Sequence, residues 1–294
     1  MADSPSHRFG QIIGDALEGA SESVLRQFAE QYGLFLDKSG PRAARKSKKL
    51  TWTDLFENKH DLDYVMERGG TDSVIGSPVA FIEIAWRRYT KHSRNKAQEI
   101  QGAVLPLLIT HRNTAPFAGA ILAGVFTQGA LEQLRSQGFS VLHFTYDTVI
   151  AAFEKVGIDA YFDEKTQRSE FSEKVEAWDA LDSSQRQAVA EGLVDVSSDE
   201  VTQFMSELRA TITRQVESVR IMPTHGSSVE KTSIEEAICF IQEYSEDPTP
   251  HPFSRYEIEV LYNNGNEVSG KFQDKDSAIQ FLRDYGAPAL RIRS

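Results

Sequence analysis

The chain has 294 residues, 40% of them hydrophobic, and its 43 acidic and 32 basic residues give a net charge of −11. This length can bury a sizeable core, and no apolar run approaches the roughly 20 residues that span a bilayer or forms a signal peptide at the start. One cysteine excludes an intrachain disulfide and a cysteine-rich zinc site, so we expect a cytoplasmic protein without a membrane partner.

The first part of the chain predicts two helices separated by a basic loop. Apolar residues recur at helical spacing from Gly10 to Phe35, which predicts an amphipathic helix broken near Gly19 or Ser21. The following PRAARKSKKLTW is basic, which suits either a nucleic-acid backbone contact or a solvated loop. A second helix is expected from about Thr53 to Glu67, with Glu57 early in it.

A short apolar run, Val79 to Trp86 (VAFIEIAW), contains one carboxylate, Glu83. The breaker residues GSP before it favour a strand that begins there. Since side chains alternate along a strand, Glu83 shares a face with Phe81 and Ala85. Burying an ionised carboxylate is costly unless it is paired or binds a metal. An ion pair with an arginine of the sheet would also explain it.

A second acid, Asp72, lies eleven positions earlier in the turn GGTDSVIG. Asp72 suits a turn or a helix cap, or it converges on Glu83. In the second case, two oxygen ligands on neighbouring strands, completed by water and substrate phosphate, would suit Mg²⁺.

The stretch from Trp86 to Lys96 contains no acid. Its basic residues are Arg87, Arg88, Lys91, Arg94 and Lys96. Such a patch attracts a phosphodiester even in an acidic protein, because dissolved salt screens the electric field of each more distant charge beyond about 8 to 10 Å. A solvated helix face has the same composition, and Lys96 could be an ordinary residue of such a face.

This combination resembles the active-site pattern of the PD-(D/E)XK, or restriction-endonuclease-like, nucleases. In that family an Asp, then an Asp or Glu, then a Lys two residues later lie on adjacent strands followed by a helix. Asp72 and Glu83 match the two acids, whereas Ala85 stands where the lysine is expected. Some members carry the lysine on the following helix, where Lys96 is the natural candidate. The resemblance covers roughly residues 60 to 160.

The resemblance implies a Mg²⁺-dependent endodeoxyribonuclease that acts on double-stranded DNA as a homodimer, either a type II restriction endonuclease or a related DNA-defence nuclease. Asp72 and Glu83 would hold the ion, and Lys96 would orient water or stabilise the pentavalent phosphate. The residues expected to contact DNA are Arg87, Arg88, Lys91 and Arg94. Glu57 resembles an extra acid that some members place on the helix before the active-site strands. Because Ala85 departs from the pattern, a noncatalytic DNA-binding or assembly subunit with a degenerate nuclease fold is the alternative, and a protein-interaction subunit is a third interpretation.

The chain then predicts alternating strands and helices. The expected elements are a strand at 117–126, a helix at 128–137 capped by Thr127 and ended by Gly138, a strand at 139–145, and a helix from Asp147 to about 156. A strand, helix, strand succession implies parallel pairing through a crossover. The predicted fold class is therefore α/β (α+β), with a mixed β-sheet flanked by helices.

Residues 159–215 carry thirteen acidic against six basic residues, which predicts helices that face away from nucleic acid. In the tail we expect a strand at 218–222, a helix at 234–244, the linker EDPTPHP, a hairpin with an Asn264-Gly265 turn, a helix ending at Tyr285 and a strand near Leu290. AICFIQEY resembles AIQFLRDY, which indicates either a duplicated unit or two helices that converged. Cys239, in the first of these helices, is expected to be buried.

The predicted organisation has four parts. Residues 1–50 form a helical N-terminal region with a basic loop, and 51–158 form the nuclease-like catalytic core. Residues 159–215 form an acidic helical segment, and 216–294 form a C-terminal α+β module suited to target recognition or dimerisation.

Overall fold

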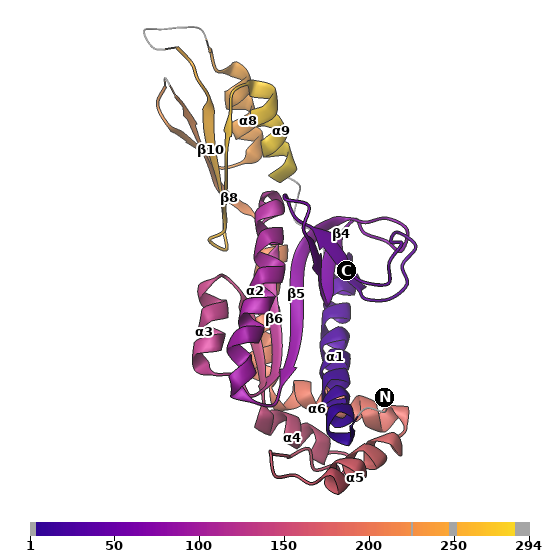
Figure 1. The fold of residues 1–294 in the computed structure, drawn as a ribbon. Helices are drawn as coiled ribbons and strands as arrows, with labels where there is room; N and C mark the ends of the chain where they lie inside the picture. Colours follow the sequence, from indigo (N-terminus) through magenta and orange to yellow (C-terminus); the bar gives the residue numbers. More distant parts are fainter. Residues whose placement is uncertain (1–3, 225, 247–251, 286–294) are drawn as a thin grey trace.

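The computed structural model describes residues 4–224, 226–246 and 252–285, and it consists of a larger body and a smaller C-terminal module (Figure 1). The strands of the body's main sheet are β1 (Leu34–Lys38), β4 (Tyr64–Arg68), β5 (Ser77–Arg87), β6 (Phe117–Gly124) and β7 (Ser140–Thr145). Their order is β1-β4-β5-β6-β7. β1, β4 and β5 are antiparallel, whereas β5, β6 and β7 run parallel. This confirms the predicted mixed sheet.

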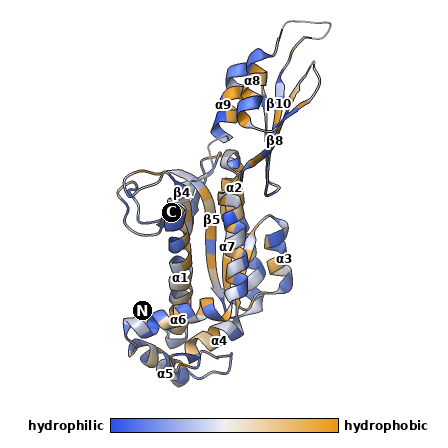
Figure 2. Cartoon of the chain, turned by 180° about the vertical axis from the view of Figure 1, so that it is seen from behind, coloured by the Kyte–Doolittle hydropathy of each residue, from blue (hydrophilic) through white to orange (hydrophobic). Residues whose placement is uncertain are grey.

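Helices cover both faces of this sheet. On one face lie α1 (Pro5–Gln31), α4 (Tyr146–Glu154) and α7 (Ser198–Ile212), against which α5 (Arg168–Asp179) and α6 (Ser183–Val196) pack. On the other face lie α2 (Ser93–Thr110) and α3 (Gln128–Ser136). Figure 2 shows hydrophobic residues along the central strands and the helices beside them. The N-terminal helix and the acidic helices therefore share one hydrophobic core with the sheet.

Several expected elements of the body are confirmed. β6 is buried along its whole length, as its small apolar residues require. The Thr127 hydroxyl accepts a hydrogen bond from the Ala130 amide at the start of α3. Gly138, with a φ of 84°, follows this helix and turns the chain into β7. The cap of α4 is Thr145, and Asp147 lies in the first turn.

The N-terminal helix is longer than expected. α1 runs without a break through Gly19 and Ser21, where Leu17, Ala20 and Ser21 are buried against the core, and the Ser21 hydroxyl donates to the Leu17 carbonyl at 2.7 Å within the helix. The predicted break is wrong, and Phe35 belongs to β1.

The predicted helix at 53–67 is also wrong. This stretch contains β2 (Thr51–Thr53), β3 (Lys59–Asp61) and the start of β4, and the first two form a two-stranded sheet. The Asp54 carboxylate accepts hydrogen bonds from the amides of Phe56 and Asn58, which closes a turn in place of a helix. β4 is buried on both faces and so lacks the alternation that identifies a strand.

The C-terminal module is an antiparallel sheet with its own core. Its elements are β8 (Val216–Pro223), β9 (Val229–Lys231), α8 (Ile234–Glu243), β10 (Tyr256–Tyr262), β11 (Glu267–Phe272) and α9 (Lys275–Tyr285), with strand order β11-β10-β8-β9. The chain therefore builds a hairpin followed by a helix twice, which favours the duplicated unit. Cys239 is exposed on α8, so its predicted burial is wrong. Most of the linker EDPTPHP and the strand near Leu290 lie outside the described residues.

Candidate active site

Two carboxylates meet where β5 extends beyond the start of β4. The register pairs Tyr64 with Ile82, so Asp63, directly before β4, lies opposite Glu83. The Asp63 amide donates to Glu83 Oε1 at 3.3 Å, and the Ile84 amide donates to Asp63 Oδ2 at 2.7 Å. The backbone thus fixes both carboxylates at one point of the sheet.

The surroundings of this pair disfavour the ionised form of both carboxyl groups. Glu83 is 6% exposed, and burial together with the charge of Asp63 raises the pKa of Glu83 to about 8. Burial also raises the pKa of Asp63, although the residue is open to solvent on one side. Among the described residues, no Lys or Arg forms an ion pair with either carboxylate, so a cation at this point would lower both pKa values.

Lys96 lies beside this pair, on the first turn of α2. Its side chain is 12% exposed, and Nζ contacts Glu99 Oε1 at 2.8 Å. The charge of Lys96 opposes the raised pKa values of both Asp63 and Glu83. Among the described contacts, however, the ammonium pairs with Glu99 and forms no ion pair with Asp63 or Glu83.

The helix that carries Lys96 packs over the strand face that Glu83 shares with Phe81 and Ala85, as the alternation predicted. Phe81 and Ala85 belong to the same core layer as Ala97 and Ile100 of α2. Ala85 is 5% exposed in that layer. A lysine at position 85 would therefore be enclosed by apolar side chains, whereas the Lys96 ammonium lies at Glu99, outside this apolar layer.

A third acid approaches from α1. Partial burial raises the pKa of Glu18, the charge of Asp63 acts in the same direction, and Lys38 opposes both. Lys38 itself is held by Glu22 at 2.6 Å. Sequence reasoning missed Glu18 and Asp63. The sequence signal for Asp63 was its position directly before the apolar run YVM, where a strand begins. That signal was missed because a helix was expected at 53–67.

Asp72 lies at the other end of the β4–β5 hairpin, so the prediction that it converges on Glu83 is wrong. Ser77 pairs with Arg68 at that end and is six residues from Glu83, roughly 20 Å at about 3.3 Å per residue. Asp72 lies beyond Ser77 in the connecting loop, and its carbonyl accepts from the Ala44 amide at 2.8 Å. A loop acid distant in space cannot share an ion with Glu83.

Glu57 is not on a helix either. It occupies the turn between β2 and β3 with a φ of 65°, and its amide donates to the Asp54 carbonyl at 3.1 Å. A left-handed turn residue on an exposed loop does not match the extra acid expected on a helix.

The four predicted DNA contacts divide into two kinds. Arg88 donates through Nε to the Phe162 carbonyl at 2.7 Å and lies 4.1 Å from the ring of Tyr146, so it stabilises the fold. Arg87 is half-buried and donates to the Trp86 carbonyl. Lys91 and Arg94 are exposed around the start of α2, with no partner among the described side chains.

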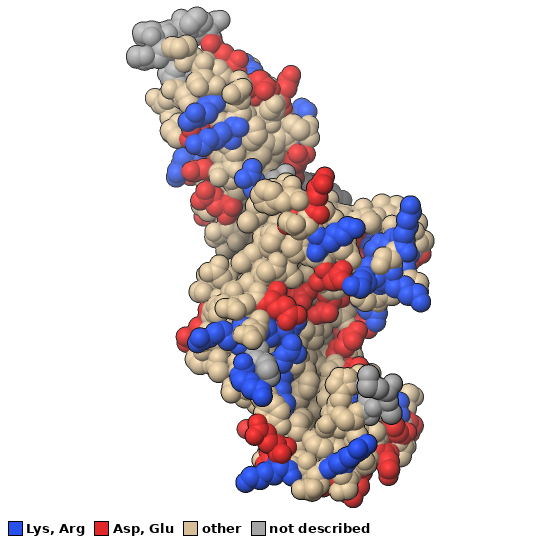
Figure 3. Space-filling model, viewed as in Figure 1, with Lys and Arg blue, Asp and Glu red and all other residues tan. Residues whose placement is uncertain are grey.

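The basic loop before β2 divides in the same way. Arg42 bridges Asp37 and Glu67 at 2.5 and 2.6 Å in a buried network. Lys46 and Lys48 remain exposed. Figure 3 shows acidic side chains across the middle of the body with basic side chains on both sides of them. The surface thus combines an acidic centre with basic flanks.

No protein-family model matches this chain, and no match was found among curated proteins or solved structures. In the described part of the chain, no helix is long and apolar enough to cross a membrane. No group of three or more His, Cys, Asp or Glu side chains there is arranged to hold a metal. A metal at this site would therefore depend on two carboxylates.

Proposed function

We propose that this protein is a Mg²⁺-dependent endodeoxyribonuclease that hydrolyses phosphodiester bonds of double-stranded DNA. The observation that carries the proposal is the buried Glu83 carboxylate opposite Asp63, a pair whose raised pKa values are opposed by the charge of Lys96 on the next helix. Asp63 then takes the place of the first acid in the nuclease pattern, and Lys96 takes the place of the lysine missing at Ala85.

The residues present fit a magnesium ion. Asp63 and Glu83 would hold it, and two carboxylates suffice because Mg²⁺ keeps several waters and also binds substrate phosphate. When bound, the ion would supply Lewis acidity to the phosphoryl group. The charge of the ion would also lower the pKa of Glu83, which burial and the charge of Asp63 raise. The ammonium of Lys96, held by Glu99, would donate to a phosphate oxygen as negative charge develops on it.

The charges around the site favour a nucleic-acid substrate. Lys91 and Arg94 lie around the start of α2, and Lys46 and Lys48 lie on the loop before β2. All four are exposed and available to phosphates. Most of the acidic segment packs as α5, α6 and α7 on the sheet face opposite α2. DNA that contacts α2 would therefore not meet those helices. A homodimer, in which each copy cuts one strand, stays part of the proposal and is tested by the oligomeric state on DNA.

The test is incubation of supercoiled plasmid with the purified protein, in Mg²⁺ and in EDTA. We expect nicked or linear products only with Mg²⁺, and none from Glu83→Gln or Asp63→Asn. Asp72→Asn is the matched control, since it makes the same chemical change outside the site, and it should cleave like the wild type.

Two outcomes would contradict this proposal. Cleavage by Glu83→Gln would remove the carboxylate pair from the mechanism. Salt-dependent DNA binding without cleavage in any divalent ion would favour the noncatalytic DNA-binding subunit.

A further inference from the structure

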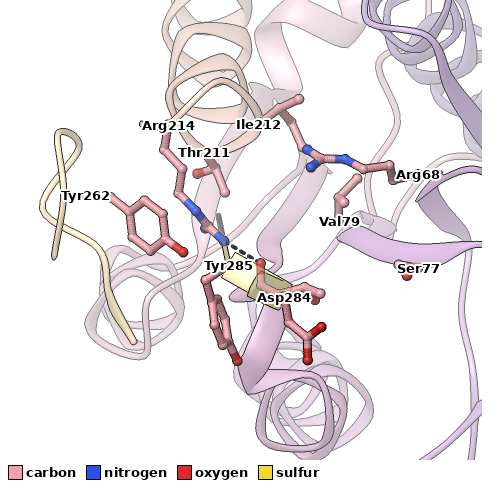
Figure 4. A pocket seen from close by; sticks show the side chains of 10 residues that line it. Arg68, Ser77, Val79, Thr211, Ile212, Arg214, Tyr262, Asp284 and Tyr285 are labelled. Carbon is pink, nitrogen blue, oxygen red and sulfur yellow. Dashed lines mark hydrogen bonds between the residues drawn. The ribbon is translucent and has the colours of Figure 1, made fainter. Parts of the chain in front are cut away.

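A cavity of about 230 Å³ lies between the central sheet and the C-terminal module. The residues that matter for its chemistry are Arg68, Ser77, Thr211, Arg214, Tyr262 and Tyr285 (Figure 4). They come from β4, β5, α7, β10, α9 and the link after α7. Ser77 begins β5 and Glu83 lies six residues further along it, roughly 20 Å away at about 3.3 Å per residue, so the cavity is separate from the proposed active site.

Arg68 enters this cavity without a partner. Its Nε is buried and has no hydrogen bond, and no described residue forms a hydrogen bond or ion pair with its guanidinium. Burial lowers the pKa of Arg68. A partly buried guanidinium is normally paired, because leaving its donors unmet costs free energy.

Arg214 adds a second positive charge, and no described acidic side chain forms an ion pair with it. Its guanidinium donates to the carbonyls of Thr114 and Ala115 at 2.5 and 2.8 Å and lies 4.6 Å from the ring of Tyr262. Burial lowers the pKa of Arg214, and the charge of Arg68 contributes in the same direction.

One acid lines the same cavity. Asp284 is on its wall, but it forms no ion pair with either arginine among the described contacts. The lining therefore carries two guanidiniums against one carboxylate, together with the hydroxyls of Ser77, Thr211 and the two tyrosines.

We propose that this cavity binds a phosphate group. The forked donors of Arg68 match an oxyanion, and the charge of Arg214 and the nearby hydroxyls add to its stabilisation. The volume is below the roughly 300 to 1,000 Å³ of pockets for drug-sized ligands. A phosphate with a small substituent fits this size, and so does one backbone phosphate of a nucleic acid. Because the walls come from both parts of the chain, the bound anion links the C-terminal module to the sheet.

The test measures thermal unfolding of the full-length protein in EDTA, with sodium phosphate replacing sodium chloride at constant ionic strength. Parallel titrations use adenosine 5′-monophosphate and a short DNA duplex. We expect a saturable rise in Tm for the wild type, and an apparent Kd at least about tenfold weaker for Arg68→Gln. Arg209→Gln, which removes an exposed charge from α7, is the matched control and should respond like the wild type.

A second readout separates a ligand site from a structural role. Without phosphate, Arg68→Gln should unfold at the same or a higher temperature than the wild type, because it removes an unpaired charge. If that variant does not fold, Arg68→Lys replaces it, because lysine keeps the positive charge but lacks the paired donors of the guanidinium. The Kd of Arg68→Lys for phosphate should lie above that of the wild type.

The probes distinguish the source of the phosphate. Saturation by inorganic phosphate or the nucleotide, with duplex binding unchanged in Arg68→Gln, supports a small phosphorylated ligand. Duplex binding weakened in Arg68→Gln and competed by phosphate supports a backbone contact. A wild-type response no larger than that to ionic strength, or an unchanged response in Arg68→Gln, would overturn the proposal. None of these outcomes depends on cleavage.

Discussion

Replacing Glu83 by Gln should stabilise the protein at high pH when no divalent ion is present. The pKa of Glu83 is about 8 in the folded protein against an ordinary 4.5. A carboxyl with a raised pKa holds its proton more tightly when folded, so the wild type loses stability as pH rises from about 4.5 to about 8. Gln has no such titration, and its side-chain oxygen can still accept from the Asp63 amide.

The size of this effect follows from the same values. One pKa unit corresponds to about 1.36 kcal/mol, so the full difference is on the order of 5 kcal/mol above pH 8. Relaxation around the site and the coupled titration of Asp63 reduce it, and we expect about 2 to 4 kcal/mol. Near pH 5 the two proteins should differ little.

The assay is urea unfolding of the wild type, Glu83→Gln and the control Asp72→Asn in EDTA at pH 5, 7 and 8.5. At pH 8.5, Mg²⁺ should restore stability to the wild type and leave Glu83→Gln unchanged. A difference between the two proteins that does not vary with pH would refute the reasoning. So would a Glu83→Gln variant that is less stable than the wild type at pH 8.5.

Three further predictions concern binding and cleavage. Because Mg²⁺ must displace a proton from Glu83, its affinity measured by calorimetry should rise about tenfold between pH 6 and 7 and about fivefold between pH 7 and 8, and a flat profile would exclude Glu83 as a ligand. Lys96→Ala should slow plasmid cleavage by about 10² or more while Mg²⁺ still binds, and wild-type rates would show that the ammonium is dispensable. Lys91→Ala should lower the salt dependence of DNA binding by about one unit, whereas Arg88→Ala should lower Tm and leave that slope unchanged.

Local patterns identified part of the site from the sequence. Glu83 was visible because a carboxylate interrupts an apolar strand, and Lys96 because it follows that strand in a basic helix. Asp63 was not, since its position opposite Glu83 depends on the register of β4 and β5, which pairs residues about twenty positions apart. Asp72 fitted the expected order of acids along the chain, but chain order does not fix which end of a hairpin an acid occupies.

The fold shows the same difference: elements with local sequence signals were predicted, whereas features that depend on contacts between distant residues were not. The sheet, its parallel strands and the C-terminal hairpin had clear turn and cap signals, such as Gly265 with a φ of 79°. β2 and β3 are three residues each, too short for any period to show, and the turn between them depends on the Asp54 side chain. Arg68 and Arg214 meet only through the tertiary structure, so no sequence pattern joins them.

The departure at Ala85 has a physical explanation in the packing of α2. Small residues at 85 and 97 lie in one apolar layer, and both are buried to 5% exposure or less. Small side chains let a helix approach a strand closely, and Lys96, next to Ala97, is thereby carried to the edge of the layer beside Glu83. A lysine at position 85 would have to displace this contact and bury its ammonium among apolar groups, at a cost of several kcal/mol. The close packing of this layer therefore explains the alanine at position 85, and it leaves the role proposed for a lysine to a residue of another element, such as Lys96.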